Sequence, residues 1–168
     1  MQRRTLLKLG AASAAVLIVA GGAAALLRPG LEGGVLSDSG REVFSAIGRA
    51  VLDKTLPAED GARQIALQGL LSRIDVLVLS LPSHAQAELS QLLALLASAA
   101  GRRTLAGLSQ PWPDASIADI QHSLQDMRLS ALALRQQAYA ALHDITAGAY
   151  FSDPSSWPLL GYPGPLKI

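Results

Sequence analysis

Histidine and carboxylate side chains occur together at two places in the sequence where they could bind a metal or exchange protons. His122 and Asp126 are four residues apart, so on a helix they would share a face and could supply two metal ligands. His143 and Asp144 are consecutive and would point about 100° apart on a helix, which places them poorly as an acid–base pair. Position 122 falls outside the apolar stripe of its segment, which favours a solvent-facing histidine. A small stand-alone enzyme or metal-binding protein using these residues is the alternative hypothesis.

The composition excludes several kinds of chemistry. The chain has 168 residues, three histidines and no cysteine. Without cysteine there can be no disulfide, no thiolate catalysis, no iron–sulfur cluster and no c-type haem attachment. No H-E-x-x-H sequence and no Gly-rich phosphate loop occurs. We therefore expect no catalytic residue, no metal site and no cofactor bound by this chain.

A stripe of polar and aromatic residues at helical spacing is the stronger signal. It consists of Arg135, Tyr139, His143, Thr146 and Tyr150. One interpretation is a half-exposed flank whose rings pack against a neighbouring helix. The other is a docking face, because tyrosine and arginine are residue types that anchor protein interfaces.

Aromatic residues are concentrated at the C-terminus. Four of the seven in the chain lie in the last 19 positions, together with Pro154, Pro158, Pro163 and Pro165. This composition predicts an extended tail over residues 152–168, whose rings would be buried by the chain's own helices or by another subunit. The predicted partner-binding residues are Arg135, Tyr139, His143, Tyr150, Phe151, Trp157, Tyr162 and Pro163.

The elements that position these residues are predicted to be helices. Apolar residues recur at helical spacing, and Pro57, Pro82 and Gly101 interrupt the pattern. The pattern predicts an all-α fold, a bundle of about five helices within residues 38–151. The expected helices cover about 39–56, 59–79, 83–100, 114–127 and 128–151, with a short helical turn at 102–108.

Local signals define the starts of these helices and their connections. Ser39 with Glu42 and Ser83 with Gln86 fit capping boxes, and Asp114 or Ser116 can cap the helix that follows. Residues 111–113, Pro-Trp-Pro, predict an extended crossing. The Gly-rich residues 28–37 predict a mobile linker ahead of the helical domain.

The N-terminus resembles an export signal. Arg3 and Arg4, followed by Leu7 and Lys8, precede a 19-residue uncharged run at positions 9–27. A basic region, an apolar region and small residues near its end are typical of a secretory signal, and the arginine pair is typical of its twin-arginine variant. We therefore expect residues 1–27 to be a signal or anchor helix. Cleavage at Ala23-Ala24-Ala25 would release the domain, whereas an uncleaved run of this length could remain as a membrane anchor.

The charge balance limits the classes of partner. Removal of Arg3, Arg4 and Lys8 with a cleaved leader would leave 11 basic and 13 acidic side chains. A nucleic-acid-binding role therefore has no electrostatic basis. About 143 residues would remain, which is enough for one domain with a single core.

Several segments together resemble a bacterial family, that of gluconate 2-dehydrogenase subunit 3 and the small subunits of related sugar and alcohol dehydrogenases. The most specific segments are the twin-arginine leader and the W-x-x-x-G-Y-P-G-P sequence at residues 157–165. The resemblance also covers residues 44–57, 128–130, 135–139, 142–145 and 149–157.

This resemblance implies a role without catalysis. Small subunits of the family accompany a large FAD-containing oxidoreductase of the glucose-methanol-choline type, and a cytochrome subunit or quinone then takes the electrons. The large subunit has no export signal of its own and crosses the membrane folded, through the twin-arginine (Tat) translocase, with its partner. We therefore expect a periplasmic accessory subunit that supports folding, stability and export of a flavoprotein. A membrane-tethered scaffold is a further alternative.

Overall fold

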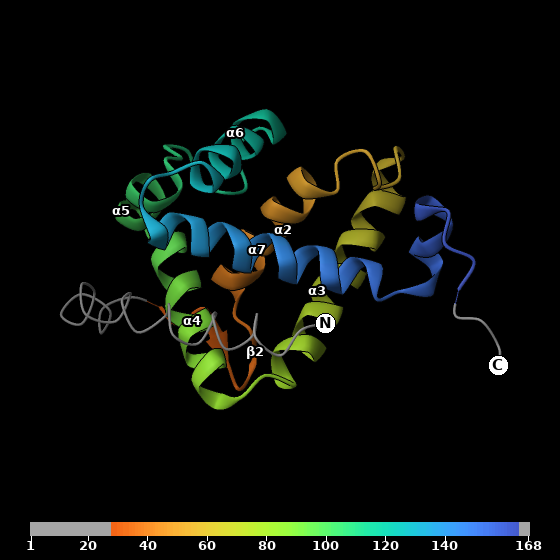
Figure 1. Ribbon diagram of the computed structural model, residues 1–168, viewed down its shortest axis with the longest axis horizontal. Coiled ribbons are helices and arrows are strands. Elements are labelled where there is room, and N and C mark those ends of the chain that lie inside the picture. The colour runs from red at the N-terminus through yellow and green to blue at the C-terminus, as the bar shows by residue number, and fades with distance from the viewer. Residues whose placement is uncertain (1–27, 165–168) are drawn as a thin grey trace.

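The computed structural model describes residues 28–164, and over this range the chain is mostly helical (Figure 1). The expected helical class is therefore confirmed. The predicted signal or anchor at 1–27, with Arg3, Arg4, Leu7 and Lys8, lies outside the described residues. The α-helices are α2 (Asp38–Val51), α3 (Asp60–Leu79), α4 (Ser83–Ala97), α5 (Ala99–Gly101), α6 (Ile117–Arg128) and α7 (Ala133–Phe151). The described residues also form a π-helix η2 (Arg102–Ala106), a 3-10 helix η3 (Pro154–Leu160) and two strands, β1 (Leu31–Glu32) and β2 (Val35–Leu36).

Helix α2 forms the centre of the fold. It packs against α3, α4, α6 and α7, and α7 crosses the middle of the molecule (Figure 1). The side chains of Val43, Phe44 and Ile47 are fully buried. Their spacing at positions 43, 44 and 47, continued by Ala50, gives the helix a single apolar face, which the surrounding helices cover.

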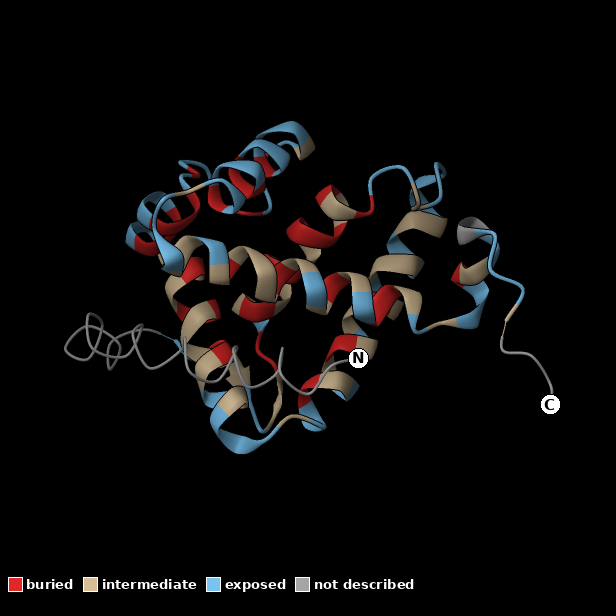
Figure 2. Cartoon of the chain, in the orientation of Figure 1, coloured by how far each residue is buried: buried red, intermediate tan, exposed pale blue. Residues whose placement is uncertain are grey.

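The surrounding helices contribute their buried sides to one core, shown in red in Figure 2. Most of the largest buried side chains belong to α3, α4, α6 and α7: Leu70, Ile74, Leu93, Leu96, Ile120, Met127 and Leu142. Helix α3 follows the expected bounds closely, since Glu59 caps it and accepts hydrogen bonds from the backbone N–H groups of Gly61 and Ala62. The Val-Leu-Val-Leu stretch at its end is helical.

The predicted mobile linker at residues 28–37 contains a β-hairpin instead. Strands β1 and β2 pair antiparallel through a two-residue turn, Gly33-Gly34, in which both residues have positive φ (61° and 85°). Such turns match the twist of a hairpin and favour glycine, so the glycines form a turn here. The hairpin is fixed to the helices, because the backbone N–H of Gly30 donates to the Ser90 carbonyl and that of Leu36 donates to Asp75 Oδ1.

The two helices with predicted capping boxes, α2 and α4, do not begin as the sequence predicted. Ser37, rather than Ser39, caps α2 by accepting a hydrogen bond from the Gly40 backbone N–H. Helix α4 begins at Ser83 itself, directly after Pro82, and no side chain caps it. Proline fixes the backbone angle of the residue ahead of the helix and thus defines this start without a cap.

The cap of α6 is Ser116, one of the two residues predicted for it. Ser116 Oγ accepts a hydrogen bond from the backbone N–H of Asp119. The segment ahead of it is a turn and not the expected extended crossing, because the N–H groups of Asp114 and Ala115 both donate to the Pro111 carbonyl. This turn buries Trp112, whose Nε1 donates to the Leu96 carbonyl at 2.8 Å.

The start of the last long helix and the C-terminal tail differ from the prediction. The last long helix begins at Ala133 instead of residue 128, because α6 continues to Arg128 and residues 129–132 connect the two helices. Residues 154–160 of the expected extended tail form the 3-10 helix η3. Among the described residues no helix is both long and apolar enough to span a bilayer, and the candidate anchor at 9–27 lies outside them.

Candidate functional site: the C-terminal aromatic concavity

The C-terminal segment is ordered by signals at both ends of η3. Asp153 caps the helix by accepting a hydrogen bond from the Ser155 backbone N–H at 2.9 Å, and Pro154 occupies its first position. Proline is favoured there because the missing N–H has no helical partner to lose. Gly161 ends the helix with a φ of 66°, a conformation that glycine adopts without steric cost. The tail prediction is thus wrong over these residues, since proline and aspartate start a helix here.

Trp157 is held in place by the end of α7. Its indole Nε1 donates to the Phe151 carbonyl at 3.0 Å, and its ring contacts the ring of Tyr162 edge to face, with centroids 5.3 Å apart. Tyr162 itself is 48% exposed. One ring is therefore anchored on the fold, and the other presents a large amphipathic surface to solvent.

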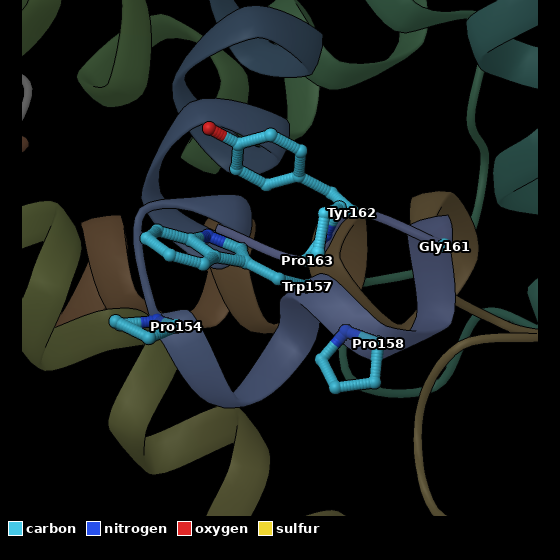
Figure 3. A pocket seen from close by; sticks show the side chains of 6 residues that line it. All are labelled: Pro154, Trp157, Pro158, Gly161, Tyr162 and Pro163. Atoms are coloured by element: carbon cyan, nitrogen blue, oxygen red, sulfur yellow. The ribbon is translucent and has the colours of Figure 1, made fainter. Parts of the chain in front are cut away.

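These residues line an open concavity of about 380 Å³, formed by Pro154, Trp157, Pro158, Gly161, Tyr162 and Pro163 (Figure 3). Figure 3 shows the rings of Trp157 and Tyr162 close together above η3. The lining is aromatic and proline-rich, and the Tyr162 hydroxyl is its one titratable side-chain group. Such a surface can bury apolar or proline-containing segments and accept a hydrogen bond at its edge.

An ion pair attaches this site to the helical core. Arg73 on α3 donates from Nε to the Ala149 carbonyl at 2.9 Å and from Nη1 to Asp153 Oδ2 at 3.0 Å. The pKa of Asp153 lies below its ordinary value of 3.8, because the Ser155 backbone N–H and then the Ser155 side chain donate to the carboxylate, with a smaller contribution from Arg73. Asp153 is thus charged at neutral pH and fixes the start of η3.

The predicted stripe on α7 is divided by the fold. Its C-terminal part belongs to the core: Thr146 is fully buried, and Tyr150 is 7% exposed and donates from its hydroxyl to the Thr55 carbonyl at 3.2 Å. Phe151 is half-buried, with its ring edge-on to that of Tyr150. Thr146 and Tyr150 are therefore part of the core and not a free docking surface.

The middle of the stripe lies at the surface. The rings of Tyr139 and His143 are stacked, with centroids 5.4 Å apart and an angle of 26° between their planes. His143 Nδ1 lies 3.1 Å from Asp144 Oδ1, so these neighbours do meet, contrary to the expected divergence. Their side chains are 41% and 70% exposed, so water reaches both groups.

Arg135, at the start of the stripe, connects two helices. Its Nε donates to the Leu105 carbonyl at 2.8 Å, which joins α7 to η2. About 22 Å of helix separates residue 135 from residue 150 at 1.5 Å per residue. The predicted partner-binding residues are therefore not one surface: Trp157, Tyr162 and Pro163 meet in the concavity, whereas Arg135 lies at the other end of α7.

Comparisons with protein-family models, with curated proteins and with solved structures gave no match to this chain. The resemblance to dehydrogenase small subunits therefore depends on the sequence segments alone.

The remaining histidine–carboxylate pair is at the surface of α6. His122 Nε2 lies 3.4 Å from Asp126 Oδ2, and the side chains are 80% and 52% exposed. In residues 28–164 no group of three histidine or carboxylate side chains has the arrangement of a metal site. The pair alone offers two ligands, which is fewer than a structural zinc site uses.

A second concavity, of about 610 Å³, was not predicted from the sequence. It follows α2 at Asp38, Arg41, Glu42, Ser45 and Arg49, with Leu71 and Pro113 opposite. The basic groups are already engaged, because Arg41 pairs with Asp75 at 2.5 Å and Arg49 donates to the Trp112 carbonyl. In the sequence, this concavity is indicated only by the recurrence of charged residues at helical spacing in residues 38–49. The two arginines connect α2 with α3 and with the Pro111–Pro113 turn.

Proposed function

We propose that this chain is a non-catalytic accessory subunit that binds, stabilises and co-exports a FAD-dependent sugar or alcohol dehydrogenase. The observation that supports docking best is the concavity at η3. There Trp157 is anchored, Tyr162 is 48% exposed, and three prolines and Gly161 form the rest of the lining. Tryptophan and tyrosine are enriched among the residues that dominate binding energy at protein interfaces.

The way in which this surface is held favours binding. Asp153 is bound by Arg73 and by the Ser155 N–H, and Trp157 is bound to the Phe151 carbonyl. Proline restricts the backbone in the same segment. A partner that contacts a surface already ordered in this way loses less conformational entropy on binding than one that must order a free tail.

The leader supplies the second part of the proposal. Arg3 and Arg4, with Leu7 and Lys8, would direct the chain to the twin-arginine translocase, which carries folded proteins. A flavoprotein bound at the C-terminal end would then enter the periplasm with its FAD. A cytochrome subunit or quinone would take its electrons there. Residues 9–27 would either be cleaved off or anchor the complex in the inner membrane.

The proposal is tested by purifying the affinity-tagged full chain from its native cells and measuring flavin in the purified material. We expect a larger protein that carries FAD and oxidises sugars or alcohols. Replacing Arg3 and Arg4 by lysine should leave that protein in the cytoplasm, whereas the control Arg28→Lys, beyond the apolar run, should not. A preparation without any flavoprotein, or export unchanged by the lysine pair, would contradict the proposal.

A further inference from the structure

One side of α3 faces solvent and carries almost no charge. After the first residue of the helix, the exposed positions are Gly61, Gln64, Ile65, Gln68, Ser72, Val76 and Leu79, here called the α3 outer face. Ile65, Val76 and Leu79 are 72%, 69% and 55% exposed. A helix on the surface of a soluble protein usually presents charged residues to water, so an uncharged side over five turns is unusual.

The charged residues of the same helix are directed elsewhere. Arg63 donates to the Pro57 and Ala58 carbonyls at the start of the helix. Arg73 binds the Ala149 carbonyl and Asp153. Asp75 accepts hydrogen bonds from the Leu36 N–H and from Arg41. Each of these charges is thus engaged by the chain's own fold, and the outer face is left free of them.

The spacing of the outer face is symmetric. From Ile65 through Gln68, Ser72 and Val76 to Leu79 the steps are three, four, four and three residues. An antiparallel copy of the helix, centred on Ser72, would therefore place each Ile65 against Leu79 of the other copy and each Gln68 against Val76. Steps of three and four residues form the seam along which helices pack side by side. A small residue at the centre permits the two backbones to approach closely.

We propose that the α3 outer face is the interface of a two-fold symmetric dimer in which the α3 helices of two copies pack antiparallel. In a two-fold interface the residues at the axis meet their own counterparts, so like charges there would repel, and the outer face has none. A lipid surface fits less well, because helices that lie on membranes carry lysine, arginine and aromatic residues at the interface. Those types are missing from the outer face.

The size of the interface determines its strength. A helix of 20 residues is about 30 Å long. One helix pair of this length is at the lower end of specific interfaces, which bury about 1,200 Å² or more, so the dimer should be reversible and dependent on concentration. The interface uses other residues than the concavity at η3. Self-association therefore does not rest on the proposed flavoprotein, and one copy of that partner could bind at each C-terminal site.

The absence of cysteine from the sequence permits a direct test. In the full chain, Ser72→Cys introduces one thiol at the proposed axis. Mild oxidation should then give a disulfide-linked dimer of twice the mass on a non-reducing gel, because two residues facing each other at the axis can reach disulfide distance. Leu79→Cys is the matched control. In the antiparallel pair residue 79 faces residue 65 of the other copy, so Leu79→Cys alone should not cross-link, and the double variant Ile65→Cys with Leu79→Cys should.

A charge placed on the interface provides the second measurement. Adding Val76→Asp to the Ser72→Cys chain should weaken self-association about tenfold or more, since the carboxylate would be buried without a partner. The control Ala118→Asp, at an exposed position of α6, should leave the cross-link unchanged. Because Val76 is exposed in the single chain, thermal unfolding of both variants should remain close to that of the unmodified chain.

Three results would overturn the dimer. Equal cross-linking of Ser72→Cys and Leu79→Cys would indicate a parallel pair. A freely reactive thiol without cross-linking, in a chain that stays monomeric at high concentration, would show the face to be open. A thiol that is protected from a maleimide reagent but does not cross-link would assign the face to another occupant, such as the flavoprotein or a membrane.

Discussion

The guanidinium of Arg73 and the carboxylate of Asp153 lie 3.0 Å apart and join the middle of α3 to the start of η3, 80 residues later in the chain. Arg73 also binds the Ala149 carbonyl, so one side chain holds both the end of α7 and the segment that follows it. The aromatic concavity is thus positioned by a helix that does not line it. Contacts of this kind determine whether Trp157 and Tyr162 form a surface or a loose tail.

Arg73→Ala should loosen η3 without unfolding the helical core. The change removes two hydrogen bonds to the C-terminal segment, while the large buried side chains of α3, Leu70 and Ile74, remain. We expect faster cleavage of residues 152–164 by protease and a shift of Trp157 fluorescence toward that of an indole in water. Arg63→Ala is the control, because Arg63 binds only groups near its own helix start. Equal effects of the two variants would contradict this role of Arg73.

Stability should decrease at acid pH partly through Asp153. Its pKa in the folded chain is below the ordinary value, mainly because of the Ser155 N–H and side chain. A depressed pKa means that the unfolded chain binds the proton more readily. The contribution is therefore complete above the pKa of an unfolded aspartate, about 3.9, and is lost as the pH falls through the lower folded value. The same direction holds for Glu59, whose carboxylate accepts from the Ala62 and Gly61 N–H groups.

The measurement compares urea unfolding of the unmodified chain and Asp153→Asn at about pH 7 and about pH 3. The variant should be less stable at the higher pH, and the difference between the two chains should narrow at the lower pH. A difference that grows on acidification would show that the folded-state pKa is not depressed.

The predictable part of the fold is the part with helical periodicity. Residues such as Val43, Ile47, Leu70 and Ile74 recur every three or four positions because each helix buries one side, so the sequence contains the pattern directly. The hairpin at 31–36 lacks such a signal. With two residues in each strand there is no alternation to detect, and the glycines of its turn resemble those of a linker.

The candidate site was predicted in part, for a similar reason. The concentration of aromatic residues near Trp157 is visible in the sequence, but their burial depends on partners that are distant along the chain. Tyr150 faces the core, where its hydroxyl donates a hydrogen bond to the Thr55 carbonyl. Arg73 forms an ion pair with Asp153, which is 80 residues later in the chain. The pair Asp153-Pro154 is a local helix-start signal that the surrounding prolines obscured.

Gly33 should tolerate asparagine better than alanine. A Cβ at this position would meet no atom within 4 Å, so the effect of a substitution comes from the backbone, whose φ is 61°. For an ordinary residue this conformation costs about 1–2 kcal/mol, and asparagine adopts it more readily than most. Urea unfolding should therefore show a loss of about 1 kcal/mol for Gly33→Ala and a smaller loss for Gly33→Asn. Equal losses would contradict a folded hairpin at residues 31–36.

Phe44 should be among the most sensitive core positions. It is fully buried on α2, the helix that packs against four others. Phe44→Ala should lower the free energy of unfolding by about 3–5 kcal/mol, because it removes apolar surface and leaves a cavity. Phe44→Leu should cost about 1.5 kcal/mol or less if the core can repack. Denaturant titrations of the two variants check this. A loss below about 1 kcal/mol for the alanine variant would argue against α2 as the centre of the core.

Tyr162→Ala should weaken capture of the proposed flavoprotein. The ring is 48% exposed and rests against Trp157, so its removal deletes an exposed anchor while the Trp157 bond to the Phe151 carbonyl remains. A central tyrosine at an interface is worth about 2 kcal/mol, or roughly a thirtyfold change in affinity. Leu132→Ala is the matched control, since Leu132 is 63% exposed on the connection before α7. Binding that responds to Leu132→Ala and not to Tyr162→Ala would place the partner near Arg135 instead.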